Sequence, residues 1–463
     1  MQPLSLEEVA RLAGGRVVGA AHGNRVCGVS IDSRRVRPGD LFVALPGARV
    51  DGHDFIPDAL QAGAAAVLAA SDRLERLPAG APAVAVPDSL VGLQALARAA
   101  RDRMAARVVG VTGSNGKTST KDLIYHVLSE AGPVYRTVGN QNTEIGLPLA
   151  LLAVEPEAWA VVLEMGMRAR GEIALLAKLA RPEIGVVTNV GPVHLETLGS
   201  VENIARAKAE LIEALPPTGT AVLNADDPRV AAMRAHTRAR VVDYGIEQPA
   251  AVRAVALESD GLTGSRFTLA FDGAQVAVSL PVPGRHQVLN ALAAAAVGLT
   301  LGLAPEAIAA GLGRASLSGM RWQTENWRGA LLINDAYNAG PASMRAALAT
   351  LAEAKAARRI AVLGDMLELG PEAPRYHREV GAYTAGRADL VVAVGRFGAE
   401  LAAGARAAGV PAEHLADPAA AGRRLRDLLQ ATDAVLFKAS RGVGLERAIG
   451  ALKGSDEEGA SHG

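Results

Sequence analysis

Cysteine is nearly absent from this sequence, which contains one, Cys27, among 463 residues. A single thiol can form neither an internal disulfide bond nor a cysteine-rich zinc site. Net charge is absent as well, because 48 basic and 48 acidic residues balance. The chain therefore lacks the basic surplus typical of proteins that bind nucleic acids. We expect Cys27 to be an ordinary core or surface residue, and we expect no nucleic-acid partner.

Long apolar runs are also missing. The longest mostly apolar stretch without charge covers residues 291–304 and falls short of the roughly 18–20 residues that a membrane-spanning helix needs. It is interpreted as a buried, alanine-rich helix. Near the N-terminus, Glu7 and Glu8 occupy the place where a secretion signal would be apolar. These absences predict a cytoplasmic protein without a membrane span.

The length and composition predict a globular protein of three domains. A prior of about one domain per 150 residues gives three for this length. Hydrophobic residues make up 49% and charged residues 21% of the chain, which is enough apolar material for several cores. Lysine supplies only seven of the 48 basic residues, so each lysine is worth inspecting for a special role.

Apolar runs alternate with helix-like stretches in three segments, which predicts an α/β fold with largely parallel sheets. Residues 1–106 are expected to form a small α/β domain, and residues 107–313 a mostly parallel sheet with helices on both faces. Residues 314–454 are expected to form a Rossmann-like α/β domain. The polar tail 455–463 is expected to be disordered.

Strands are expected where the apolar runs lie, at residues 41–45, 65–69, 83–86, 108–112, 160–164, 185–189, 221–224, 330–334, 359–364, 390–394 and 434–438. A helix is expected over 88–106. An antiparallel hairpin is expected over about 251–282, where apolar and polar residues alternate between glycines.

The stretch VVGVTGSNGKTSTKDLIYHVL, residues 108–128, joins a predicted strand to a helix start through a glycine-rich turn. Backbone N–H groups of such a turn converge on one point, and the helix dipole favours an anion there. Gly113 and Gly116 permit a tight turn close to phosphates, Lys117 supplies a positive charge and Thr118 a hydroxyl for Mg²⁺. The strict P-loop pattern fails, because valine occupies its first glycine position. A shortened phosphate cradle is predicted, with an ordinary strand-to-helix turn as the alternative.

Two further runs end on polar residues that suit a site for a nucleotide and a metal ion. The run WAVVLE ends on Glu164, and the run IGVVTN ends near Asn189, with His194 shortly after it. Ligands bind at the carboxyl ends of strands in open α/β sheets, and a P-loop site needs an acid there to hold Mg²⁺. Mg²⁺ prefers oxygen ligands, so on this pattern alone His194 is more readily a structural histidine.

Four stretches, TGSNGKTSTK, LEMGMR, NVGPVHLETLGS and IARAKAEL, resemble in order and spacing the ATPase domain of the Mur ligase family. The stretch SIDSRRVRPGDLFVALPGARVDGHDFIPDALQAGAAAVL is similar to the nucleotide-sugar domain of the third- and fourth-step ligases. The stretches GNQNTEIGLP, LGDMLELG, NDAYNAGPASMRAAL and FKASRGVGLERAI resemble the fourth-step ligase. The resemblance covers roughly residues 25–450. It implies a cytoplasmic ligase that joins D-alanyl-D-alanine to UDP-N-acetylmuramoyl-tripeptide (UDP-MurNAc-tripeptide) through an acyl phosphate, with ATP and Mg²⁺, in peptidoglycan precursor synthesis.

The resemblance also implies roles for single residues. The ATP phosphates would be bound by Gly113, Ser114, Asn115, Gly116, Lys117, Thr118 and Ser119. The adenine would meet Asn290, while Arg321 and Asp335 would close over phosphate and ribose. Catalysis and metal binding would involve Lys117, Thr118, Glu164, His194 and Lys208.

The family carbamylates the lysine that Lys208 matches. A bare ammonium next to Mg²⁺ would be repelled, whereas a carbamate supplies an oxygen ligand that suits the ion. Without the resemblance, Lys208 is better interpreted as an exposed helix lysine paired with Glu202 or Glu210.

Substrate contacts follow from the same resemblance. Ser33 and Arg34 match residues that meet the uridine diphosphate, and Asn140 and Asn142 match residues that hold the sugar-peptide. Looser matches place four residues against the dipeptide: Asn338, Lys438, Ser440 and Arg441. Three positions depart from the family pattern: Gln287, Thr143 and Gly340, the last of which puts a contact of the C-terminal domain in doubt.

Several alternatives remain open from the sequence. The third-step ligase shares the ATPase core, but no stretch like DNPR occurs in the third segment. A folate-polyglutamate ligase shares the core without the first segment. A P-loop switch protein would need neither the first nor the third segment, and a plain α/β binding module would leave His194 and Lys208 incidental. A monomer is the default expectation.

Overall fold

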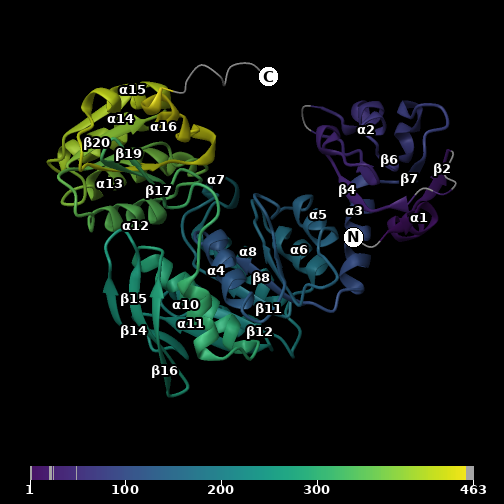
Figure 1. The fold of residues 1–463 in the computed structure, drawn as a ribbon, viewed down its shortest axis with the longest axis horizontal. Coiled ribbons are helices and arrows are strands. Elements are labelled where there is room, and N and C mark those ends of the chain that lie inside the picture. The colour runs from purple at the N-terminus through teal and green to yellow at the C-terminus, as the bar shows by residue number, and fades with distance from the viewer. Residues whose placement is uncertain (1–2, 20–22, 24, 48–49, 455–463) are drawn as a thin grey trace.

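The computed structural model describes residues 3–19, 23, 25–47 and 50–454. It contains three α/β blocks, each built on a main sheet of its own. Figure 1 shows them in a bent row, with the N-terminal and C-terminal blocks at opposite ends and the largest block between them. The predicted α/β class with large, mostly parallel sheets is confirmed. The domain limits at residues 106 and 313 stay predictions, and the tail 455–463 lies outside the described residues.

The N-terminal block carries a five-stranded sheet in the order β2-β7-β6-β5-β4, in which only β2 is antiparallel to its neighbour. Helix α1 begins with a capping box, because Ser5 and Glu8 each satisfy the other's backbone N–H group. Cys27 is exposed, one of its two expected environments. The elements are β1 (Leu4–Ser5), α1 (Leu6–Ala13), β2 (Arg16–Val18), β3 (Arg25–Val26), β4 (Gly28–Ser30), β5 (Asp40–Val43), α2 (Ile56–Gln61), β6 (Ala66–Ala70), β7 (Ala83–Val86) and α3 (Ser89–Asp102).

The central block carries a nine-stranded sheet in the order β16-β15-β14-β13-β12-β11-β8-β10-β9. The seven strands along the sheet from β9 to β14 pair with one another in parallel. Strands β14, β15 and β16 form an antiparallel meander at one edge, where a hairpin was expected. The strands are β8 (Arg107–Thr112), β9 (Val134–Arg136), β10 (Ala160–Glu164), β11 (Ile184–Val187), β12 (Thr220–Asn224), β13 (Arg240–Gly245), β14 (Val252–Ser259), β15 (Ser265–Phe271) and β16 (Ala274–Leu280).

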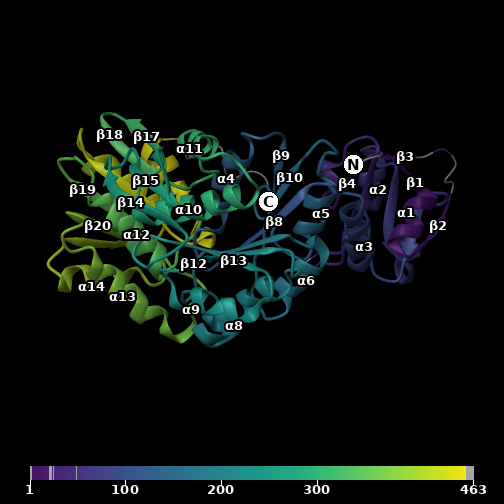
Figure 2. The same cartoon turned by 90° about the horizontal axis from the view of Figure 1, so that it is seen from below.

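Helices cover both faces of the central sheet, as predicted. One face packs against α4, α10 and α11, and the other against α5, α6 and α8 (Figure 2). The helices are α4 (Lys117–Leu128), α5 (Gly146–Leu152), α6 (Glu172–Ala180), α7 (Leu195–Leu198), α8 (Val201–Glu213), α9 (Pro228–Ala231), α10 (Arg285–Thr300) and α11 (Pro305–Gly313). Helix α10 contains the predicted alanine-rich segment up to Thr300, four residues short of its expected end at 304, and most of its residues from Val288 to Gly298 are buried.

The C-terminal block carries a six-stranded sheet in the order β17-β18-β22-β19-β20-β21, in which only the edge strand β17 is antiparallel. The strands are β17 (Gln323–Trp327), β18 (Ala330–Asn334), β19 (Arg359–Leu363), β20 (Leu390–Val394), β21 (Ala412–Leu415) and β22 (Ala434–Lys438). The helices are α12 (Pro341–Leu351), α13 (Ala373–Tyr383), α14 (Gly398–Ala407), α15 (Pro418–Leu428) and α16 (Glu446–Lys453). Within the described part of the chain, no helix is both long and apolar enough to cross a membrane.

Close helix packing in the C-terminal block can be tested at Gly381. A Cβ atom there would lie 2.0 Å from the carbonyl oxygen of Leu401 and 2.9 Å from the nitrogen of Ala405, where α13 meets α14. We expect Gly381→Ala to destabilise this block by about 1–3 kcal/mol, because the helices must move apart. Thermal denaturation should show a lower Tm. Gly313→Ala is the matched control, since its nearest neighbour would lie at 3.5 Å; equal Tm values for both variants would contradict this packing.

Candidate active site

The predicted phosphate cradle lies between β8 and α4, at the carboxyl edge of the central sheet. Gly113 and Gly116 adopt positive φ angles of 151° and 81°. A Cβ atom on Gly113 would lie 1.8 Å from the hydroxyl oxygen of Thr188, and one on Gly116 would lie 2.7 Å from the side-chain oxygen of Asn290. Only glycine leaves room for these two neighbours at these backbone angles.

The loop after β11 holds the cradle in shape. Asn189 accepts a hydrogen bond from the Asn115 N–H at 2.9 Å and donates one to the Asn115 carbonyl at 3.0 Å. Thr188 donates to the same carbonyl at 2.6 Å, and Ser114 exchanges hydrogen bonds with the backbone of Gly191. The predicted strand over 185–189 therefore ends at Val187, because the next two side chains bond to the cradle. Sequence reasoning noted Asn189 as the end of a run but did not see this role.

Lys117 and Thr118 begin α4 directly behind the cradle. The Lys117 ammonium donates to the Gly113 carbonyl at 2.8 Å, and burial lowers its pKa, an effect that the nearby Glu164 carboxylate opposes. Thr118 donates to Glu164 at 2.6 Å. The other carboxylate oxygen of Glu164 accepts from Asn142 at 2.8 Å. Asn142, which the sequence assigned to substrate, thus fixes the orientation of the predicted metal ligand.

Arg321 reaches this site from the segment that leads into the C-terminal block. Its guanidinium donates to the Thr118 hydroxyl at 2.9 Å and stacks 3.8 Å from the centre of the Tyr337 ring. Asn290 lies against Gly116 of the cradle, and its side-chain amide donates to Gln287 at 2.9 Å. The structure therefore brings together Lys117, Thr118, Glu164, Asn290 and Arg321.

Lys208 is buried on α8, with 2% of its surface exposed. Burial holds the pKa of its amine well below the ordinary value, and the charge of Lys117 lowers it further. The alternative of an exposed lysine is wrong, because Glu210 bonds to backbone N–H groups of residues 171 and 174 while Glu202 bonds to Arg229. A lowered pKa favours the neutral amine, which is the form that can react with CO₂.

His194 lies beside the site at the start of α7, with a φ angle of 55°. Its Nδ1 atom contacts the carboxylate of Glu368, which belongs to the C-terminal block. This hydrogen bond lowers the pKa of Glu368. Sequence reasoning did not single out Glu368, although it lies within LGDMLELG. Among the described residues, no three His, Cys, Asp or Glu side chains gather as a ready metal site.

The remaining predicted residues of the C-terminal block bond mainly within that block. Lys438 forms an ion pair with Asp335 at 2.7 Å and donates to the Asn338 carbonyl at 3.0 Å. Ser440 accepts from the N–H of residue 367 at 3.0 Å, and Arg441 pairs with a glutamate of α16. His286, which the sequence did not indicate, lies near Asp335 and Lys438, and burial lowers its pKa to about 4.

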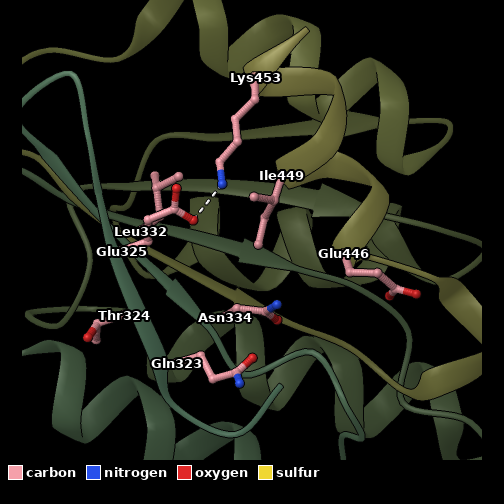
Figure 3. Close-up of a pocket in the computed structure, with 8 residues that line it drawn as sticks. All are labelled: Gln323, Thr324, Glu325, Leu332, Asn334, Glu446, Ile449 and Lys453. Atoms are coloured by element: carbon pink, nitrogen blue, oxygen red, sulfur yellow. Dashed lines mark hydrogen bonds and ion pairs between the residues drawn. The ribbon is translucent and has the colours of Figure 1, made fainter. Parts of the chain in front are cut away.

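The predicted substrate residues of the first two blocks lie apart from this cluster or at its rim. Ser33 and Arg34 occupy a 3-10 turn after β4 in the N-terminal block, where Arg34 pairs with Asp32. Asn140 lies in the turn that leads to Asn142, whose N–H bonds to the Asn140 carbonyl. A separate hollow of about 440 Å³ lies between β17, β18 and α16 and contains none of the predicted site residues (Figure 3).

Comparison with known proteins identifies the family. Three family models match consecutive parts of the chain: "Mur ligase family, catalytic domain" over residues 25–101, "Mur ligase middle domain" over 111–298 and "Mur ligase, glutamate ligase domain" over 320–441. This chain belongs to the Mur ligase family.

The similarity to curated and solved relatives extends along the whole length. A UDP-N-acetylmuramoyl-tripeptide--D-alanyl-D-alanine ligase of Mycobacterium tuberculosis is 42% identical over 98% of this chain and 99% of its own. The crystal structure of MurF from Acinetobacter baumannii, 29% identical, superposes with a TM-score of 0.89 over 98% of this chain and 99% of its own. MurF from Thermotoga maritima, solved in complex with ADP, is 30% identical with a TM-score of 0.80 over 92% of this chain and 97% of its own.

The shape of the cradle yields a direct test. Gly113→Ala would force its Cβ atom into Thr188 at an unfavourable φ angle. We expect ADP affinity to fall at least about tenfold, because the N–H groups of the cradle would be displaced from the phosphates. Isothermal titration calorimetry measures the affinity. Gly191→Ala is the control, because its nearest neighbours would lie at 3.9 Å. Equal affinity in both variants would mean that nucleotide binds elsewhere.

Proposed function

We propose that this chain is an ATP-dependent ligase that joins D-alanyl-D-alanine to UDP-MurNAc-tripeptide in peptidoglycan precursor synthesis. The observation that carries the proposal is similarity along the whole chain: relatives that bear this name align with 98% of it. The cradle, Glu164 and Arg321 supply the matching chemistry at one point. We further propose that the protein works in the cytoplasm as a monomer.

The reaction proceeds in two displacements. The terminal carboxylate of the tripeptide attacks the γ-phosphorus of ATP, the bond to the bridging oxygen of ADP breaks, and an acyl phosphate and ADP result. The amine of D-alanyl-D-alanine then attacks the acyl carbon, phosphate departs with the bonding electrons, and the amine loses a proton. The first displacement replaces a poor leaving group on the acyl carbon with a good one.

The residues of this chain assist by position and charge. The N–H groups of residues 113–119 cradle the phosphates, and Lys117 and Arg321 stabilise the negative charge that spreads over the transferred phosphoryl group. Arg321 connects the C-terminal block to the cradle. Closure of that block excludes water, which would otherwise hydrolyse the acyl phosphate. Asp335 and Asn290 are proposed to hold ribose and adenine.

The oxygen donors at the strand ends fit Mg²⁺. Thr118 and Glu164 place a hydroxyl and a carboxylate 2.6 Å apart behind the cradle, and hard oxygen ligands are those that this ion prefers. Bound Mg²⁺ would neutralise charge on the phosphate oxygens. His194 and a carbamylated Lys208 are proposed for a second ion, and Glu368 would orient the His194 ring in the way that carboxylates orient metal-bound histidines.

Substrate recognition is proposed to involve all three blocks. Ser33 and Arg34 would meet the uridine diphosphate, and Asn140 and Asn142 the sugar-peptide. Asn338, Lys438, Ser440 and Arg441 are proposed near the dipeptide. Lys438 and Ser440 bond within their own block, so we assign them to shaping the dipeptide site. Arg441, which is half-exposed beside α16, is the residue that we propose contacts the dipeptide.

The ligase proposal predicts that phosphate release from ATP and Mg²⁺ requires both UDP-MurNAc-tripeptide and D-alanyl-D-alanine, because the second displacement liberates the phosphate. A coupled phosphate assay measures it, with omission of each substrate as the control. Release without either substrate would contradict the proposal and favour a P-loop switch ATPase. Release with a free amino acid and the shorter precursor would instead identify the preceding ligase.

Carbamylation of Lys208 predicts a ¹³C carbamate resonance when the protein is incubated with ¹³C-bicarbonate near neutral pH. The neutral amine attacks the carbon of CO₂ and loses one proton, which its lowered pKa favours. Lys208→Ala should abolish the resonance. Lys178→Ala, which removes an exposed lysine, should leave it intact. A wild-type spectrum without the resonance, or a resonance that survives in Lys208→Ala, would contradict the assignment.

A further inference from the structure

A buried carboxylate, Asp122, lies in the middle of α4 and contacts two parts of the chain that are distant in sequence. Its side chain is fully buried. One oxygen accepts a hydrogen bond from Arg136 on β9 at 2.9 Å, and the other accepts two from Ser318, at 2.8 Å from the backbone N–H and 2.7 Å from the hydroxyl. Lys121 lies 3.4 Å away. None of the proposed chemistry uses this carboxylate.

Ser318 belongs to residues 314–322, the linker between the central and C-terminal blocks. The backbone of this linker is unusual after the serine, since Gly319, Met320 and Trp322 all have positive φ angles, of 34°, 46° and 52°. Left-handed angles at Met320 and Trp322 cost energy, so surrounding contacts must hold them in place. The two hydrogen bonds from Ser318 to Asp122 are the contacts nearest to the start of this strained segment that tie it to the central block.

Arg321 lies inside the strained segment and closes a ring of contacts with α4. Its guanidinium donates to the carbonyls of Ser318 at 3.1 Å and Gly319 at 3.2 Å, and to the Thr118 hydroxyl at 2.9 Å. Thr118 and Asp122 are four residues apart on α4 and so share one face of that helix. The Ser316 N–H also donates to the His126 ring at 3.2 Å, so the linker is held at three points, each one turn apart, on the helix that begins at the phosphate cradle.

We propose that Asp122 is a positioning residue that anchors the linker between the blocks and so holds the Arg321 guanidinium at the phosphate end of the cradle. The inference rests on the proposed function, in which Arg321 meets the phosphates. Asp122 acts through Ser318 and Arg321 and does not itself touch a substrate. The position of the Arg321 guanidinium, which belongs to the linker, therefore depends on the Asp122 carboxylate of the central block.

The carboxylate is specifically suited to this task. Asp122 acts only as an acceptor in its three short hydrogen bonds, whose donors are a guanidinium, a backbone amide and a hydroxyl. An asparagine of the same shape offers only one acceptor oxygen, and its NH₂ group would face either Arg136 or the Ser318 N–H. If the NH₂ group faces the Ser318 N–H, a buried donor loses its acceptor and the linker is released; if it faces Arg136, the side chain loses the contact that holds it against Ser318.

The test is a double-mutant cycle of Asp122→Asn, Arg321→Ala and the two together. Affinities for ADP and a non-hydrolysable ATP analogue are measured by calorimetry, and kcat and KM for ATP by phosphate release. We expect Asp122→Asn to reduce the preference for the ATP analogue over ADP, and kcat/KM, by about five- to fiftyfold, the range of coupling between contacting residues. In the Arg321→Ala background, the same substitution should change neither quantity by more than about twofold.

Two further variants keep the test sharp. Ser318→Ala removes one of the two linker hydrogen bonds and should cause a smaller loss that is likewise absent in Arg321→Ala. Asp433→Asn alters an equally buried carboxylate, paired with Arg358 at the far side of the C-terminal block. It should lower Tm without changing the preference between nucleotides, which separates positioning from general stability.

Three results would overturn the inference. Equal losses from Asp122→Asn with and without Arg321 would show that the carboxylate acts by another route. If Asp433→Asn changed the nucleotide preference as much as Asp122→Asn does, the effect of Asp122→Asn would be explained by a general loss of stability. No effect of Arg321→Ala alone would remove the residue through which Asp122 acts. The ligase proposal fails separately, if phosphate release by the wild-type protein does not depend on the two substrates. The double-mutant cycle measured by nucleotide binding can still be interpreted in that case.

Discussion

The site depends on one constraint: β10, β8 and β11 are parallel neighbours, so their carboxyl ends meet at one edge of the central sheet. Each end places a different group there. Strand β8 leads into the cradle, β10 ends on Glu164, and β11 leads into the Thr188–Asn189 pair that shapes the cradle. A shift in the order of these strands would separate these groups. All three strands are mostly buried on both faces, as is typical of parallel sheets that helices cover on both sides.

Much of this edge could be predicted from the sequence because its signals are local. A five-residue apolar run, two glycines and the pair Lys117–Thr118 define the cradle within a dozen residues, and Glu164 follows directly from the end of another run. The α/β class follows from alternation in the same way. The strand predicted at 185–189 ends two residues early, at Val187, and the apolar pattern gives no sign that the side chains of Thr188 and Asn189 bond to the cradle.

Contacts between distant segments could not be read from the sequence. Glu368 against His194 and Ser318 against Asp122 each join residues more than 170 positions apart, and neither has a local pattern that announces it. The same applies to Lys208, whose place in a helical pattern favours an exposed position until tertiary packing buries it. The family resemblance supplies the proposed role of Lys208, and the structure adds one physical observation in support, which is an amine without access to water. Burial and electrostatics are properties of the assembled fold, and the sequence contains them only through that fold.

Positive charge outweighs negative charge inside the site, and this imbalance explains its design. Lys117, Arg321 and Lys208 lie within reach of one another's fields, with Glu164 as the carboxylate beside the cradle. Desolvation makes such a surplus costly unless an anion arrives or a cation gives up its proton. In the proposed reaction, phosphates relieve the charge of Lys117 and Arg321, whereas burial and the charge of Lys117 lower the pKa of Lys208 and so favour its neutral form. Carbamylation of Lys208, as proposed, would reverse the sign at that position and add a hard oxygen donor where a divalent cation would otherwise be repelled. The burial of positive charge is therefore the single physical cause behind both proposals, the binding of nucleotide and the modification of Lys208.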